Sequence, residues 1–177
     1  MAVRTILGAM VLGCAGALSA QSAPTATPPP PPSCGGPEHR QFDFWVGKWT
    51  VTQTGKDQVV ASSLVESIYG GCVVRENWMP LKGSAGGSLN NYVDGRWRQT
   101  WVDASNSRVD FVGGLVNGKM VLVGDWKGVN GPGKDAIIRM TYSKNADGSV
   151  RQHGEQSTDH GLRWSTNFDF TYHPKAR

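Results

Sequence analysis

The amino-acid sequence predicts an all-β domain built from consecutive antiparallel hairpins. From residue 45 onward, short segments rich in Val, Thr, Trp and Tyr alternate with turn-forming residues. No window shows a sustained helical period, apart from a turn expected within residues 37–44. A meander of about ten strands has to close or fold over to protect its edges, so we expect an up-and-down barrel or a sandwich.

The chain begins with a segment typical of exported proteins. Met1 to Arg4 is a short positive start, the apolar run Thr5–Leu18 follows, and small residues precede Gln21. This pattern predicts a signal peptide over residues 1–20. The run of about fourteen residues is too short to span a bilayer as a helix.

Residues 21–33 read QSAPTATPPPPPS and predict a Pro-rich linker with too little apolar surface to build a core. The folded domain is therefore expected over residues 34–177, a length suited to one domain. The net charge of +4 is spread along the chain without a basic cluster, which argues against nucleic-acid binding.

The three cysteines have different expected roles. Cys14 ends a partial lipobox, which leaves open a lipid anchor through Cys14 or ordinary cleavage near Ala20; the apolar residues after Cys14 favour cleavage. Cys34 and Cys72 are an even pair in a small exported domain, so we expect a disulfide rather than a metal site. Such a bond would tie the N-terminal arm to the strand that starts after Cys72.

The predicted strands follow one another with short gaps from residue 45 to residue 172. They are Trp45–Gln53, Val59–Ile68, Val73–Met79, Gly87–Tyr92, Arg96–Asp103, Val109–Val116, Met120–Trp126, Ala136–Tyr142, Val150–Ser157 and Trp164–Tyr172. The pairs Asp94-Gly95, Asn117-Gly118 and Asp147-Gly148 predict tight hairpin turns in which both residues take positive φ.

The most distinctive motif is Phe42-Asp43-Phe44-Trp45-x-Gly47-x-Trp49 at the start of the domain. Its Gly-x-Trp resembles the lipocalin and calycin signature, in which the Trp closes one end of a barrel. The longer run, with residues 70–78, 96–103, 150–153 and 157–159, resembles a family of exported, uncharacterised bacterial proteins with a calycin-like fold. The resemblance covers about residues 34–172 and implies a calycin-like barrel in the cell envelope, without a settled activity.

Two strands place polar side chains on the same face as tryptophans. Alternation puts Glu76 with Trp78, and Gln99 and Asp103 with Trp97 and Trp101. Tryptophans are too large and apolar to point outward on every strand, so we expect these polar groups inside the barrel, with Arg139 or Arg151 as partners. The candidate ligand-binding residues are Trp45, Trp49, Glu76, Trp78, Trp97, Gln99, Trp101 and Asp103. Packing at the barrel end is the alternative role of Trp45 and Trp49.

Other motifs carry no catalytic or cofactor prediction. The nitrobindins, which are haem-binding barrels, also open with Gly-x-Trp but continue with glycines where this chain has residues 50–53 TVTQ, so no haem is expected. His153-x-Glu155 lacks a third metal ligand, so we interpret both as polar residues that face the solvent. The loop Gly128–Asp135 resembles a phosphate-binding P-loop, but Asp135 stands where Ser or Thr is needed. No metal or other cofactor is predicted.

Three functions remain open from the sequence. The first is an exported barrel that binds a small apolar or aromatic ligand. The second is an enzyme that uses the same cavity, with Glu76 or Asp103 as general base and Gln99 as an oxyanion-type donor. The third is a filled barrel that serves as a structural or protein-interaction domain. A cavity inside the barrel would separate the first two functions from the third.

Overall fold

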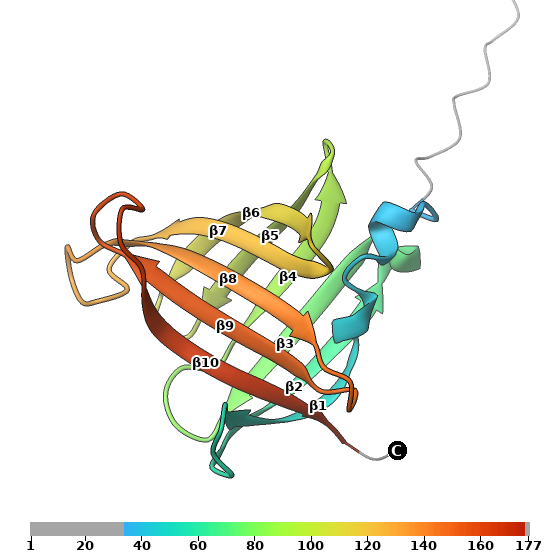
Figure 1. Cartoon of the computed structure of the whole chain (residues 1–177), viewed down its shortest axis with the longest axis horizontal. Coiled ribbons are helices and arrows are strands. Elements are labelled where there is room, and N and C mark those ends of the chain that lie inside the picture. The colour runs from blue at the N-terminus through green and yellow to red at the C-terminus, as the bar shows by residue number, and fades with distance from the viewer. Residues whose placement is uncertain (1–33, 176–177) are drawn as a thin grey trace, which may run out of the picture. The chain divides into compact units, whose positions relative to one another are not determined.

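In the computed structural model, which describes residues 34–175, ten antiparallel strands form a closed barrel (Figure 1). Each strand pairs with its neighbours in sequence, and the first strand pairs with the last. The strands are β1 (Gly47–Gln53), β2 (Val59–Ile68), β3 (Val73–Pro80), β4 (Gly86–Val93), β5 (Arg96–Asp103), β6 (Arg108–Val116), β7 (Lys119–Trp126), β8 (Ala136–Lys144), β9 (Val150–Ser157) and β10 (Ser165–Pro174). The expected all-β, up-and-down barrel is confirmed.

Short 3₁₀ helices are the remaining regular structure of the described residues. They are η1 (Pro37–Arg40), η2 (Asp43–Trp45) and η3 (Tyr69–Gly71). Strand accounts for 60% of the described residues and helix for 7%. The turn expected within residues 37–44 therefore consists of η1 and the start of η2. No helix within residues 34–175 is long and apolar enough to cross a membrane.

The predicted strand boundaries agree with the structure to within two residues at every end. Trp45 differs in its type of secondary structure, since it was predicted as the first residue of a strand. It is the last residue of η2, because the Val46 N–H bonds to the Asp43 carbonyl oxygen at 3.0 Å and closes a 3₁₀ turn; the backbone becomes extended only at Val46.

Two of the three predicted turns have the expected geometry. Asp94-Gly95 and Asn117-Gly118 take positive φ at both residues, as tight hairpins of this twist require. The prediction is wrong for Asp147, because only Gly148 has positive φ. Here the turn is longer: the Gly148 N–H bonds back to Asn145, and the Asp147 carboxylate accepts hydrogen bonds from the Ser149 N–H and hydroxyl.

One end of the barrel is sealed by the segment that contains η1 and η2, drawn in blue and cyan in Figure 1. Phe42 and Trp45 are fully buried, with stacked rings 5.0 Å apart. Trp45 also lies 4.8 Å from the Tyr142 ring, and the Trp49 indole N–H donates to the Trp45 carbonyl oxygen at 3.0 Å. This end is therefore filled with aromatic side chains.

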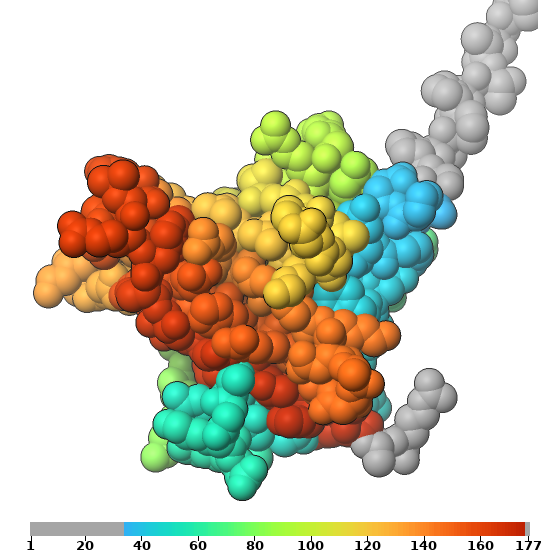
Figure 2. All heavy atoms as spheres, viewed as in Figure 1, coloured from blue at the N-terminus to red at the C-terminus, as the bar shows by residue number. Residues whose placement is uncertain are grey.

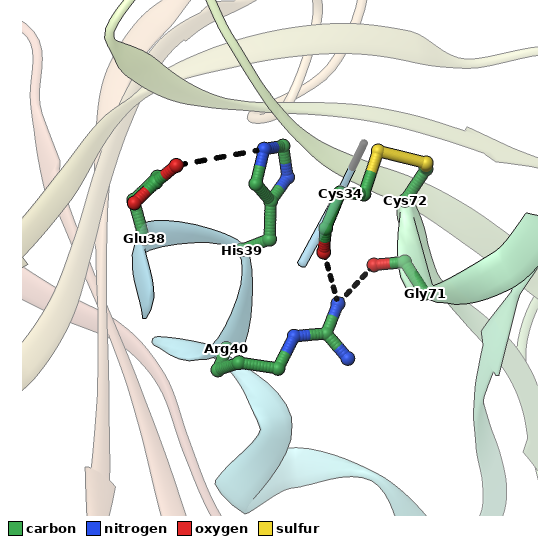
Figure 3. The surroundings of a disulfide bond; sticks show 6 residues. All are labelled: Cys34, Glu38, His39, Arg40, Gly71 and Cys72. Atoms are coloured by element: carbon green, nitrogen blue, oxygen red, sulfur yellow. Dashed lines mark hydrogen bonds and ion pairs between the residues drawn. A yellow bond between two sulfur atoms is a disulfide. The ribbon is translucent and has the colours of Figure 1, made fainter. Parts of the chain in front are cut away.

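The predicted disulfide is confirmed: Cys34 and Cys72 are bonded, with their Cα atoms 5.0 Å apart (Figure 3). Arg40 supports the same junction, since its guanidinium donates to the carbonyl oxygens of both Cys34 and Gly71. The bond fastens the sealing segment to the loop before β3. A structural disulfide persists in oxidising compartments, so this bond indicates a non-reducing environment for the domain.

The opposite end is formed by the five loops that follow the odd-numbered strands. The longest two, residues 127–135 and 158–164, both project at the left of Figures 1 and 2. The predicted signal peptide (residues 1–20), the linker (21–33) and Cys14 lie outside the described residues.

Candidate ligand cavity

A cavity of about 370 Å³ lies inside the barrel, toward the end opposite η1 and η2. Its mouth is formed by Val60, Pro80, Lys82 and Ser84. Five half-buried aromatic side chains form its walls: Trp78, Trp101, Trp126, Phe168 and Phe170. Its innermost part, called the floor below, is formed by seven buried residues: Glu76, Gln99, Phe111, Met140, Tyr142, Gln152 and Tyr172.

Strand alternation creates this lining as expected on β3 and β5. Glu76 and Gln99 point inward and are only 4% and 3% exposed, and Trp78 and Trp101 follow them toward the mouth. The register inferred from the tryptophans is therefore confirmed. Glu76, Trp78, Gln99 and Trp101 all line one cavity.

Inward glycines make room for the aromatic walls. A Cβ atom on Gly154 would lie 2.3 Å from the Phe168 ring, and one on Gly86 would lie 2.7 Å from the Trp101 ring. Each glycine thus accepts an aromatic ring directly against its backbone. A larger residue would push the ring away and change the cavity.

The Glu76 carboxyl is the buried ionisable group of the floor. Its Oε1 atom accepts hydrogen bonds from the Ser63 hydroxyl at 2.9 Å and from the Tyr172 hydroxyl at 3.1 Å. Burial raises the pKa of Glu76 to about 7, and these two hydrogen bonds oppose the shift only in part. The other oxygen, Oε2, has no hydrogen-bond partner among the described residues.

A chain of hydrogen bonds continues from Glu76 across the floor. The Tyr172 hydroxyl shares its single proton between Glu76 Oε1 and the Gln152 side-chain oxygen, which lies 2.7 Å away. The Gln152 amide donates to the Tyr142 hydroxyl at 2.9 Å. Gln99 donates to the same hydroxyl at 3.3 Å and to the Asn90 side-chain oxygen at 2.5 Å. The floor is thus a connected polar network that joins β3, β10, β9, β8, β5 and β4.

The prediction that Arg139 or Arg151 pairs with the buried polar residues is wrong. Arg139 pairs with Glu155 at 2.9 Å and Arg151 with Asp169 at 2.5 Å, outside the cavity. On β8 the buried positions are Ala136, Ile138, Met140 and Tyr142, so Arg139 points the other way. Hydroxyl groups bond the Glu76 carboxyl in place of the expected arginines, and side-chain amides continue the network, so no second buried ion is present among the described residues of the floor.

Three of the predicted ligand-binding tryptophans lie away from the cavity. Trp45, Trp49 and Trp97 are almost fully buried at the sealed end and do not line it. The Trp97 indole N–H donates to the Gln41 side chain of the sealing segment at 3.1 Å. For Trp45 and Trp49, the packing role weighed in the sequence analysis is the observed one.

Asp103 also lies outside the lining, at the end of β5. Its carboxylate accepts hydrogen bonds from the Trp101 indole at 3.0 Å and from Ser105. Burial alone would raise the pKa of Asp103, but the hydrogen bonds from Ser105, Trp101 and Ser107 outweigh it and lower the pKa below its usual range. Asp103 is therefore a positioned partner of Trp101 rather than a base inside the cavity.

The suggested oxyanion-type role of Gln99 is not supported by its contacts. Its side-chain nitrogen already donates to Asn90 and to Tyr142. The Gln99 group without a partner among the described residues is the oxygen, Oε1, which is an acceptor.

Most of the cavity residues that the sequence analysis missed lie on strands of the second half of the chain. They are Phe111, Trp126, Met140, Tyr142, Gln152, Phe168, Phe170 and Tyr172. The same alternation that revealed Glu76 and Gln99 is present there, as in Phe168-x-Phe170-x-Tyr172. The mouth residues on loops, such as Lys82, carry no comparable pattern.

The remaining motifs lie on the surface, as interpreted from the sequence. His153 contacts the Thr166 hydroxyl at 3.1 Å, and Glu155 is used by Arg139. Residues 34–175 contain no group of three or more His, Cys, Asp or Glu side chains placed to hold a metal ion. The loop Gly128–Asp135 connects two strands, and Asp135 bonds back to the Gly128 N–H at 2.9 Å.

Comparisons with known proteins add no family to this description. No protein-family model matches the chain, and the search of curated proteins finds no match.

Proposed function

We propose that this domain binds a small, mostly apolar or aromatic molecule inside its barrel. The cavity of about 370 Å³ carries the proposal, because it combines five aromatic wall residues with a polar floor. Small-molecule sites are typically concave, mostly apolar pockets of about 300–1,000 Å³ with a few placed polar groups. The volume lies near the small end of that range, which suits a ligand of one or two rings. A filled structural barrel would lack this space.

The proposal includes export to the cell envelope. The disulfide between Cys34 and Cys72, the signal-peptide pattern over residues 1–20 and the Pro-rich residues 21–33 support it together. The resemblance to exported calycin-like proteins points the same way. Release as a soluble protein after cleavage near Ala20 and a lipid anchor through Cys14 are the two forms of this proposal.

The direct test is native mass spectrometry of freshly purified protein. We expect a bound small molecule that is absent after the protein is unfolded and refolded with its disulfide intact. Refolded protein is then titrated with an aromatic ligand library while tryptophan fluorescence is followed. The absence of a co-purified molecule together with no binding in the library would overturn the proposal.

A matched pair of variants locates the binding. Trp101→Leu removes a wall ring but keeps an apolar side chain, so affinity should fall at least about tenfold, on the scale of one buried aromatic contact. Trp164→Leu is the control, since Trp164 lies in the loop before β10 and does not line the cavity. Equal effects of the two changes would place the ligand elsewhere.

A second candidate function is an enzyme with Glu76 as general base or acid. The observation that favours it is a buried carboxyl with a pKa near 7 and a free oxygen in an open cavity. A pKa close to working pH is the value at which proton transfer is most effective. Glu76→Gln should then abolish turnover of a substrate that still binds.

A further inference from the structure

The floor of the cavity presents two hydrogen-bond acceptors without a partner among the described residues, and the first is the side-chain oxygen of Gln99. Hydrogen bonds fix the orientation of the amides that identify it. Asn90 donates from its side-chain nitrogen to the Val74 carbonyl oxygen at 2.9 Å, and a carbonyl can only accept. The Asn90 oxygen therefore faces Gln99, whose nitrogen donates to it at 2.5 Å. This orientation leaves the Gln99 oxygen without a partner among the described residues.

Glu76 contributes the second unpaired acceptor. Its Oε1 atom holds the hydrogen bonds from Ser63 and Tyr172, and Oε2 is free among the described residues. Glu76 and Gln99 both line the cavity and are both buried. A ligand that covers these two acceptors must therefore bring N–H or O–H donors, because an acceptor removed from water without a donor weakens binding.

Among the described residues, no cationic side chain balances Glu76 inside the cavity. Lys82 is the one basic residue of the lining, and it is an exposed residue at the mouth. The walls instead present the rings of Trp78, Trp101 and Trp126, whose faces attract positive charge. A carboxylate, free acceptors and aromatic faces form a set that complements an organic cation with N–H donors.

We propose that the cavity binds aromatic or apolar amines, with the protonated nitrogen at Glu76 Oε2 and Gln99 Oε1 and the apolar part between the tryptophans. This inference rests on the proposed ligand-binding function and names its ligand class. A neutral ligand would satisfy fewer acceptors, and an anionic group would lie beside the Glu76 carboxyl with no cation nearby.

The proposal predicts a proton linkage. Tyr142 and Tyr172 are the titratable groups that face Glu76 within the described barrel, and burial raises the pKa of both, so they stay neutral near pH 7. An ammonium at Glu76 favours the carboxylate, so binding at pH 7 should release about half a proton, and affinity should rise as pH increases from 6 to 8.5.

The test compares three ligands of one shape: 4-phenylbutylamine, 4-phenyl-1-butanol and 4-phenylbutyrate. Isothermal titration of refolded protein at pH 8 should give at least about tenfold tighter binding of the amine than of the alcohol, with the carboxylate weakest. Repeating the amine titration at pH 7 in buffers of different ionisation enthalpy should reveal the released proton, and this measurement needs no variant.

Two variants complete the experiment. Glu76→Gln places an N–H donor in the floor, so the preference for the amine over the alcohol should disappear. Glu66→Gln removes an equal charge at a half-buried residue that pairs with Arg75 outside the cavity, and it should keep the preference. Equal affinity of amine and alcohol for the unaltered protein would overturn the amine proposal and leave ligand binding intact. Binding of none of the three probes, with no ligand found in the library, would overturn both.

Discussion

The clearest physical prediction concerns the pH dependence of stability at Glu76. In the unfolded chain its pKa lies near 4.5, and in the folded barrel burial raises it to about 7. The folded protein therefore binds one more proton than the unfolded chain between these values. Because the folded pKa is the higher one, the favourable contribution is fully present below pH 4.5 and is lost as pH rises through 7.

The magnitude follows from the size of the shift. One pKa unit corresponds to about 1.4 kcal/mol, so the change from 4.5 to about 7 is worth about 3 kcal/mol of unfolding free energy. Most domains unfold at a cost of about 5–15 kcal/mol, so this loss is measurable. Hydrogen bonds from Ser63 and Tyr172 are already included in the shifted value.

The assay is urea unfolding of refolded, disulfide-intact protein at pH 4.5 to 8.5, for the unaltered protein and for Glu76→Gln. Glutamine does not ionise, so the stability of the variant relative to the unaltered protein should rise by about 3 kcal/mol across this range. Glu66→Gln, at a half-buried residue paired with Arg75 outside the cavity, should show no such rise. If the difference in unfolding free energy between Glu76→Gln and the unaltered protein stays constant with pH, Glu76 is not a buried carboxyl with a raised pKa.

Three further predictions concern the fold. Thiol titration of the unreduced domain from residue 34 onward should detect no free thiol, and two titratable thiols would contradict the disulfide. The double variant Cys34→Ser, Cys72→Ser should unfold with a free energy lower by about 3–4 kcal/mol, because the disulfide closes a loop of 38 residues. Gly154→Ala should destabilise by about 1–3 kcal/mol because its Cβ meets the Phe168 ring, whereas Gly114→Ala, with open space around its Cβ, should be neutral in the same urea assay. Far-UV circular dichroism should show mostly strand with under about a tenth helix, and a helical content near a third would disagree with the barrel.

Much of the fold was predictable because its signals are local. Strand period, turn pairs and the separation of inner from outer side chains depend on residues within about ten positions of each other. That is why the ten strands appear near their predicted bounds and why Glu76 and Gln99 point inward beside Trp78 and Trp101. The pairing of two cysteines was predictable for another reason, since only one pair remained for the folded domain.

The candidate site was predictable only in part, because its contacts join distant strands. Tyr172 reaches Glu76 from 96 residues away, across a barrel that closes only when β1 pairs with β10. Nothing in the local pattern distinguishes Tyr172 from any other inward aromatic residue. The expected arginine partners failed for a different reason: Arg139 alternates with the buried residues of β8 and points outward, and Arg151 pairs with Asp169 outside the cavity.

The sequence by itself determined the strands, the inward faces of β3 and β5 and the cysteine pair, because these depend on short-range periodicity and composition. Only the tertiary structure decided which end of the barrel is sealed and which is open. Trp45 and Trp101 are alike in the sequence as inward-facing candidates, yet one packs into the aromatic seal and the other lines the cavity. Their positions along the barrel axis follow from strand register and from the folding of η1 and η2 over one end, and both arise from long-range packing.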